Sequence, residues 1–533
     1  QNLAIEERTM LTGTEAAPAP QFYADAAVVA FRIPGNEVAK TLENAKVSSS
    51  GGKFDVKMLT DGDLASKSLL PYLKPGEYAW IQYAFAEPIT IQTITVSGGI
   101  NSGVFGGAGN PDDRILESSN DGKVFQKVTS VRSNRVGQIT LSFAPVTAKY
   151  FRYSVKTPMP APDRMAGLFG GSQRRAAGPT GTQIAEFKLH SAMLINRFEE
   201  KAAFCVAGDL ASSPTPDAGN GDVISKADIQ DLTQMMKPDG TLDWTAPAGN
   251  WKIMRFGYSL TGHKNSPASP EATGLEVDKL SAKHVKAYFT DYLDQYKDAT
   301  GGLMGKKGLQ YIITDSWEAG AQNWTENLPA DFKAKRGYDM IQWLPVMAGY
   351  IVENTNESER FLWDVRKTLG ELITENHYDQ LTDLLNQRGM KRYTESHEDG
   401  RAFIGDGMEI KRTAYVPMSA TWTPRPDEKD IQTRFKADVR ESASVSHIYG
   451  QTFVAAESMT AIASAWQWSP ETLKPTADME LANGLNRFVI HTSVHQPVND
   501  KIPGLGLGPF GQWYTRHETW GEQAGVWLTY LAR

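Results

Sequence analysis

Four short segments in the second half of the chain carry carboxylates, histidines or both, and each follows an apolar run that predicts a strand. The segments are residues 314–318, 393–398, 456–459 and 491–497. Carboxylates gathered where water is excluded shift one another's pKa values, so one can stay protonated while another remains charged. Glycoside hydrolysis needs such a pair as general acid and general base.

The acidic residues of these segments are Asp315 and Glu318, then Glu395 and Glu398, then Glu457. If the preceding strands are parallel, their carboxyl ends share one rim, where the active site of a βα barrel lies. A single carboxylate at such a position is often solvated or caps a helix. Several on one rim favour catalysis.

Histidines and an acidic loop accompany these carboxylates. His491 and His495 are four apart, but they follow a strand, so the spacing does not place them on one helical face. We expect them and His397 to hydrogen-bond sugar hydroxyls, with a metal-ligand role as the alternative. The loop with Glu395, His397, Glu398, Asp399 and Asp406 offers oxygen ligands suited to Ca²⁺, the alternative being an ordinary solvated loop.

Tryptophan is unevenly distributed: three of thirteen lie in residues 1–316 and ten in the remainder. Trp324 and Trp466 could stack on the apolar face of a sugar, or simply pack in a core.

Other catalytic chemistries fit the sequence less well than glycoside hydrolysis does. The sequence has no Gly-x-Ser-x-Gly elbow, no phosphate-binding loop or dinucleotide fingerprint after a strand, and no His-Glu-x-x-His pair. Cys205 lies far from the histidines and is expected to be structural.

Alternating helical and strand periods from about residue 275 predict a parallel sheet, most simply part of an eight-stranded (β/α)8 barrel. The sequence contains four βα units, with strands at 309–313, 390–394, 452–456 and 486–491 and helices that include 361–387, 435–449 and 472–483. A closed barrel needs eight strands. Either the sheet is open, or the first barrel strands lie outside this chain.

Residues 41–192 have a different character, with short strands separated by turns, which predicts an inserted β-sandwich. Within 89–96 the apolar alternation slips by one residue, which indicates a β-bulge. Asn120-Asp-Gly-Lys123 predicts a tight hairpin turn, and residues 157–183, rich in Gly and Pro, predict a long exposed loop. Leu59-Thr-Asp-Gly-Asp63 and Tyr150-Phe-Arg-Tyr153 resemble the discoidin or coagulation-factor type C module, a jelly roll. That resemblance implies a carbohydrate-binding module or a purely structural sandwich.

Composition limits the remaining choices. The 533 residues carry a net charge of −7, which argues against nucleic-acid binding, and the single cysteine excludes an internal disulfide. No apolar run is long enough to span a membrane. The chain starts at Gln1 without a signal-peptide pattern, as expected of a mature form or a fragment. We divide it into the start of a catalytic region (1–40), a β-sandwich (41–192), a β-rich connector (193–274) and a barrel portion (275–533).

Ordered phrases along the chain resemble glycoside hydrolase family 106, the α-L-rhamnosidases. They include Trp244-Thr-Ala-Pro-Ala-Gly-Asn-Trp251, Asp315-Ser-Trp-Glu318, Arg336-Gly-Tyr-Asp339, Arg360-Phe-Leu-Trp-Asp364 and Ala456-Glu-Ser458. The resemblance implies an inverting, calcium-dependent hydrolase within a longer protein. By position it implies Glu318 as the acid, Glu457 as the base, and Glu395 as a sugar or metal contact. The segment 414–422, interpreted as a loop, departs from the acidic phrase expected there, which puts substrate contacts in that segment in doubt.

We therefore expect a bacterial, periplasmic or secreted enzyme that removes terminal α-L-rhamnose from glycosides or polysaccharides. The alternatives are a carbohydrate-binding protein without catalysis and a glycosidase for another sugar. The expected substrate contacts are Asp315, Trp324, Glu395, His397, Trp466, His491 and His495.

Overall fold

The computed structural model describes most of the chain. The described residues are 22–35, 44–98, 110–132, 134, 136–159, 179–205, 207–265, 268–397, 404–424, 428, 430–462, 466–493, 495–504, 510 and 514–533. Across these ranges, no helix combines the length and apolar composition needed to cross a bilayer.

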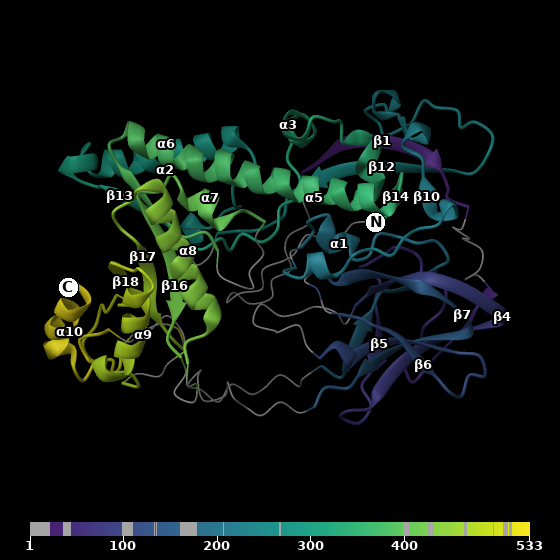
Figure 1. Cartoon of the computed structure of the whole chain (residues 1–533), viewed down its shortest axis with the longest axis horizontal. Coiled ribbons are helices and arrows are strands. Elements are labelled where there is room, and N and C mark those ends of the chain that lie inside the picture. The colour runs from purple at the N-terminus through teal and green to yellow at the C-terminus, as the bar shows by residue number, and fades with distance from the viewer. Residues whose placement is uncertain are drawn as a thin grey trace.

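A five-stranded parallel sheet forms the C-terminal half (Figure 1). All four predicted strands are present, with bounds shifted by a few residues. The strands, in sheet order, are β13 (Tyr311–Thr314), β15 (Lys391–Thr394), β16 (Val416–Trp422), β17 (Ala455–Thr460) and β18 (Arg487–Ile490). Among the described residues the sheet is open, with β13 and β18 at its edges.

The fifth strand, β16, corrects the interpretation of residues 414–422 as a loop. It is the central strand, and all but its last residue are buried. Pro417 is normally a signal against a central strand, because it lacks the N–H that a ladder needs. Here the pairing of β15 with β16 is limited to Tyr393↔Val416 and Thr394↔Pro417.

Helices alternate with these strands as predicted. The first helix starts later than expected, at Ala282, and the long helix runs without a break to Gln387 through a π-helical turn, Ile373–Asp379. The helices of this half are α2 (Ala282–Ala299), α3 (Leu328–Arg336), α4 (Leu344–Met347), α5 (Thr355–Leu372), α6 (Gln380–Gln387), α7 (Gly407–Lys411), α8 (Thr433–Tyr449), α9 (Pro470–Ala482) and α10 (Ala524–Leu531).

An antiparallel β region lies apart from the parallel sheet, at the lower right of Figure 1. One sheet has the order β2-β4-β7-β5-β6, with β9 also paired to β4, and β3 pairs with β8 in a second, two-stranded sheet. Tyr83, Phe151 and Phe187 lie in its core. The bounds are β2 (Lys46–Ser49), β3 (Ser68–Pro71), β4 (Tyr78–Ser97), β5 (Arg114–Ser119), β6 (Gln126–Ser130), β7 (Gln138–Lys156), β8 (Gly181–Ile184) and β9 (Glu186–His190).

Several local predictions for this region can be checked. The register between β4 and β7 shifts between Ile91 and Thr93, where the phase slip predicts a bulge. The turn at Asn120 is longer than a tight hairpin, since β5 ends at Ser119 and β6 begins at Gln126. Most of the predicted exposed loop, residues 160–178, lies outside the described residues.

The start of the chain joins the connector. β1 (Tyr23–Arg32) pairs antiparallel with β12 (Trp251–Ser259), and β11 (Gln230–Asp231) lies on its other side. The apolar centre of β1 contributes to the largest core among the described residues, which also receives Trp317 and Phe361 from the C-terminal half. Two short elements complete this part, the parallel pair β10 (Val223–Ile224) and β14 (Ile351–Val352) and the helix α1 (Phe198–Lys201).

Candidate active site

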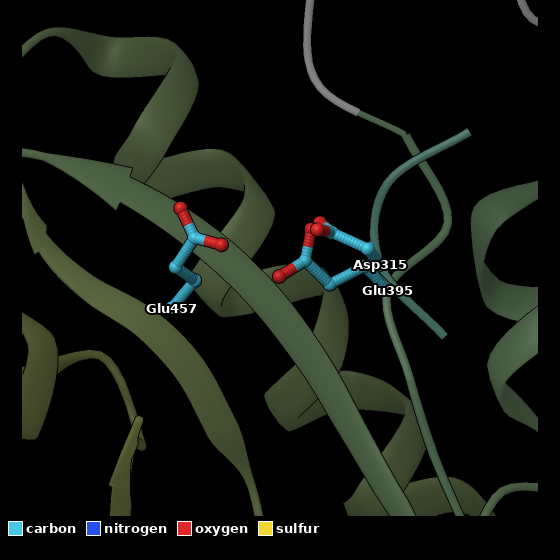
Figure 2. A group of neighbouring side chains, drawn as sticks. All are labelled: Asp315, Glu395 and Glu457. Atoms are coloured by element: carbon cyan, nitrogen blue, oxygen red, sulfur yellow. The ribbon is translucent and has the colours of Figure 1, made fainter. Parts of the chain in front are cut away.

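Three carboxylates from separate strands meet at one place. Asp315 follows β13, Glu395 follows β15, and Glu457 lies within β17. Each contributes one oxygen to a group in which all the oxygens lie within 4.8 Å of one another. Figure 2 shows the carboxylates of Asp315 and Glu395 side by side, with Glu457 facing them. The predicted convergence of these three carboxylates is therefore observed.

Strand register explains why Asp315 and Glu395 are neighbours. Thr314 pairs with Thr394, so the residues that follow them leave the sheet together. The Glu395 amide donates to the Thr314 carbonyl (3.0 Å), and the Trp317 amide donates to the Ser396 carbonyl (3.0 Å). These two backbone hydrogen bonds hold the segments after β13 and β15 next to each other.

Glu457 is held by its own strand. It pairs with Ala420 of β16 on one side and Val489 of β18 on the other. The chain bends just beyond it at Met459, whose φ of 69° is unusual for a residue with a side chain. Thr460 Oγ1 then donates to Glu457 Oε1 at 2.9 Å, which orients the carboxylate.

The electrostatics of the group centre on Glu395, which is only 2% exposed. Burial raises its pKa well above the ordinary value, and the negative charges of Asp315 and Glu457 raise it further. The Ser316 hydroxyl donates to Glu395 Oε2 and opposes this shift, while Oε1 has no hydrogen-bond partner among the described residues. Three carboxylates at this spacing need a proton or a cation among them.

The arrangement fits a divalent cation such as Ca²⁺. Calcium binds oxygen ligands at roughly 2.3–2.6 Å, so two ligands of one ion can lie up to about 5 Å apart. The observed limit of 4.8 Å satisfies this condition. The unpartnered Glu395 Oε1 supplies a buried acceptor, and water or substrate hydroxyls would complete the shell.

Glu318 lies in the loop after β13 but is not a member of this group of three. It is partly buried. The loop is anchored around it, because Trp317 Nε1 donates to the Gly320 carbonyl and Asn323 Nδ2 donates to the Ala202 carbonyl. Trp324, further along, packs partly against the largest core, and its ring centroid lies 6.4 Å from that of Tyr258.

The remaining predicted contacts are spread more widely. His397 follows Ser396 and is partly buried, and residues 398–403 of the acidic loop lie outside the described part. The His491 amide donates to the Ser458 carbonyl (2.9 Å), which places it beside the strand that carries Glu457. His495 is exposed. Trp466 is 48% exposed, and its Nε1 donates to the His517 carbonyl. Asp406 caps α7 through the amides of residues 408 and 409.

Sequence reasoning missed a second layer of ionisable groups behind the site. Lys411 is fully buried and forms ion pairs with Asp438 and Glu441 of α8. The signal was available, because Asp438 and Glu441 are three apart on a helix and flank its apolar stripe. Carboxylates on a helix are usually solvated, so the spacing alone did not reveal their burial.

A buried acid on the opposite side of β17 gives a testable consequence for stability. Burial raises the pKa of Glu480 to about 7, although a hydrogen bond from Thr421 opposes the shift. An acid whose pKa is raised on folding destabilises the fold as pH rises from its unfolded value of 4.5 through about 7. We expect Glu480→Gln to raise the free energy of unfolding at pH 8 by up to about 3 kcal/mol, with little change near pH 4.5.

Denaturant titrations at the two pH values measure this effect. Glu471→Gln, an exposed position on the same helix, is the control and should show no such difference. Equal stability of Glu480→Gln and the parent protein at pH 8 would contradict the prediction.

Comparisons with known proteins identify the family of this chain. The family model for glycoside hydrolase family 106, described as alpha-L-rhamnosidase, matches residues 1–533. A solved rhamnosidase from Novosphingobium sp. PP1Y superposes with a TM-score of 0.82 and 36% identity, over 99% of this chain and 48% of that one. A curated protein from Formosa agariphila, named "Putative beta-glucuronidase", is 36% identical over 311 residues, covering 58% of this chain and 26% of that protein. The chain thus spans about half the length of the solved relative and about a quarter of the curated one. Family model and solved relative together show that this chain belongs to glycoside hydrolase family 106, the α-L-rhamnosidases.

Proposed function

We propose that this protein hydrolyses terminal α-L-rhamnosyl groups from glycosides or polysaccharides with inversion at the anomeric carbon. The observation that carries the proposal is the convergence of Asp315, Glu395 and Glu457 at the end of a parallel sheet. Family membership and the solved relative, titled a rhamnosidase, support the sugar. The five parallel strands would be part of an eight-stranded barrel completed by other segments of the protein.

In this proposal, Glu457 is the general base and Glu318 the general acid. Glu457 would remove a proton from water on one face of the sugar, while Glu318 protonates the departing glycosidic oxygen on the other. Inverting enzymes keep these two carboxyls roughly 6.5–9.5 Å apart, which leaves room for the water. Glu318 lies outside the tight group of three, and its separation from Glu457 is the distance that this mechanism requires to fall in that range.

Asp315 and Glu395 would hold the calcium ion, with Glu457 at its edge. When bound, the ion would offset the negative charges of the three carboxylates and orient sugar hydroxyls. His397 and His491 would donate hydrogen bonds to the sugar, and His495, Trp324 and Trp466 stay candidates for further contacts. A periplasmic or secreted location in a bacterium also belongs to the proposal, since such glycosides are met outside the cytoplasm.

Hydrolysis of an aryl α-L-rhamnoside, with and without EDTA, tests this function. We expect turnover that falls by at least tenfold on chelation and returns with Ca²⁺, because removing the ion leaves three carboxylates to repel one another. Proton NMR of the first product should show β-rhamnose. Initial release of α-rhamnose would refute inversion, and unchanged activity in EDTA would refute the calcium role.

The name of the Formosa agariphila relative supports a second candidate, a glycosidase acting on β-glucuronides. An aryl β-glucuronide assayed beside the rhamnoside distinguishes the two. Binding of rhamnosides without turnover would instead favour a carbohydrate-binding protein.

A further inference from the structure

The buried ammonium group of Lys411 lies behind the site. It contacts two carboxylates, one of which reaches Ser396 beside Glu395 and the other Ala420 beside Glu457. Lys411, at the end of α7, has no solvent-exposed surface. Its Nζ lies 3.2 Å from Asp438 Oδ1, 2.9 Å from Glu441 Oε1 and 3.0 Å from Ser442 Oγ. All three hydrogens of the ammonium are therefore used, and its position is fixed.

Asp438 connects this group to the strand beside Glu457. Its second oxygen, Oδ2, accepts a hydrogen bond from the amide of Ala420 at 2.9 Å. Ala420 is the residue of β16 that pairs with Glu457 of β17. The ion pair thus fixes the backbone directly alongside the proposed base.

Glu441 connects the same group to the other side of the site. Its Oε1 lies 3.5 Å from the hydroxyl of Ser396, the residue that follows Glu395. Close packing maintains this contact, since a methyl group on Gly407 of α7 would come within 2.3 Å of Glu441 Oε1. The glycine therefore allows α7 to approach α8 closely enough for Lys411 to reach both acids.

We propose that Lys411, with Asp438 and Glu441, forms a positioning cluster that sets the spacing between Glu395 and Glu457. The cluster touches neither sugar nor reacting water. It acts through Ala420 and Ser396, and its ammonium balances the charges of the two partly buried carboxylates Asp438 and Glu441. The kinetic part of its test rests on the proposed rhamnosidase function, whereas the structural part does not.

The first test replaces Lys411 by Met, which keeps the length and removes the charge. Displacement of a catalytic group by about 1 Å can lower turnover by roughly a hundredfold. We expect Lys411→Met to lower kcat by about tenfold to a hundredfold with KM changed less than about threefold. Hydrogen exchange at the Ala420 amide should speed up, because its acceptor is no longer held.

Lys201→Met is the matched control. Lys201 is also buried, 1% exposed, and pairs with Glu359 of α5 rather than with Asp438 and Glu441. It should lower the melting temperature comparably without lowering kcat when both variants are assayed well below their melting temperatures. Equal losses of kcat in the two lysine variants would show that Lys411 only stabilises the fold, and would overturn the proposal.

A pair of substitutions at Asp438 covers the case in which Lys411→Met does not fold. Asp438→Asn keeps an oxygen acceptor for the Ala420 amide, and Asp438→Ala removes it. We expect the Asn variant to retain at least about tenfold more of kcat than the Ala variant, and to protect the Ala420 amide better. Indistinguishable kcat and exchange would overturn the proposal. If the parent protein hydrolyses no rhamnoside, the proposed function fails, and amide exchange alone decides the positioning role.

Discussion

Exchange of Glu457 for Gln should lower kcat for rhamnoside hydrolysis by about 10²–10⁴-fold, the range typical of a lost general base. The amide keeps the shape and can still accept from Thr460 Oγ1, so the strand should stay in register. Because the base acts on water, the loss should be equal for substrates with good and poor leaving groups. Steady-state kinetics on two rhamnosides of different leaving-group pKa measure this.

The control for Glu457→Gln is Thr460→Ala, which removes the hydrogen bond to Glu457 Oε1 but leaves the carboxylate. Thr460→Ala should lower kcat far less than Glu457→Gln does. Near-normal turnover in Glu457→Gln would rule out this residue as the base. Asp315 and Glu395 would then be the candidates for that role.

The loss of activity in Glu318→Gln should, by contrast, depend on the leaving group. A general acid is needed most when the departing oxygen is basic, so an alkyl rhamnoside should lose about 10²–10⁴-fold in kcat/KM. For a dinitrophenyl rhamnoside, whose leaving group needs no protonation, kcat/KM should fall much less.

Glu326→Gln, an exposed carboxylate eight residues further along, is the matched control and should leave both substrates unaffected. An equal loss on the two substrates for Glu318→Gln would show that Glu318 is not the acid.

The site could be predicted from the sequence to the extent that strand ends position it. Short apolar runs identified β13, β15 and β17, and parallel strands must bring their carboxyl ends to one rim. Asp315, Glu395 and Glu457 follow from that rule alone. The position of Glu318 does not, because it lies in a loop whose path is set by distant contacts such as Asn323 with Ala202.

The central strand and the buried cluster escaped prediction for different reasons. Pro417 weakens the strand signal of β16, and only the tertiary fit of α8 against β16 makes the segment extended and buried. Lys411 looks like any lysine near a helix end. Its burial depends on Gly407 and on two carboxylates about thirty residues away, which no local pattern records.

The pairing of β1 with β12 has a consequence for biosynthesis. The five residues from Ala27 to Phe31 are buried and apolar, yet their partner strand is translated roughly 220 residues later. At about 5–20 residues per second, β1 waits on the order of ten to forty seconds without its partner. The antiparallel β region, whose strands all lie between β1 and β12 in the sequence, can fold during that interval. An apolar strand left unpaired for so long is a natural client for a chaperone at the ribosome.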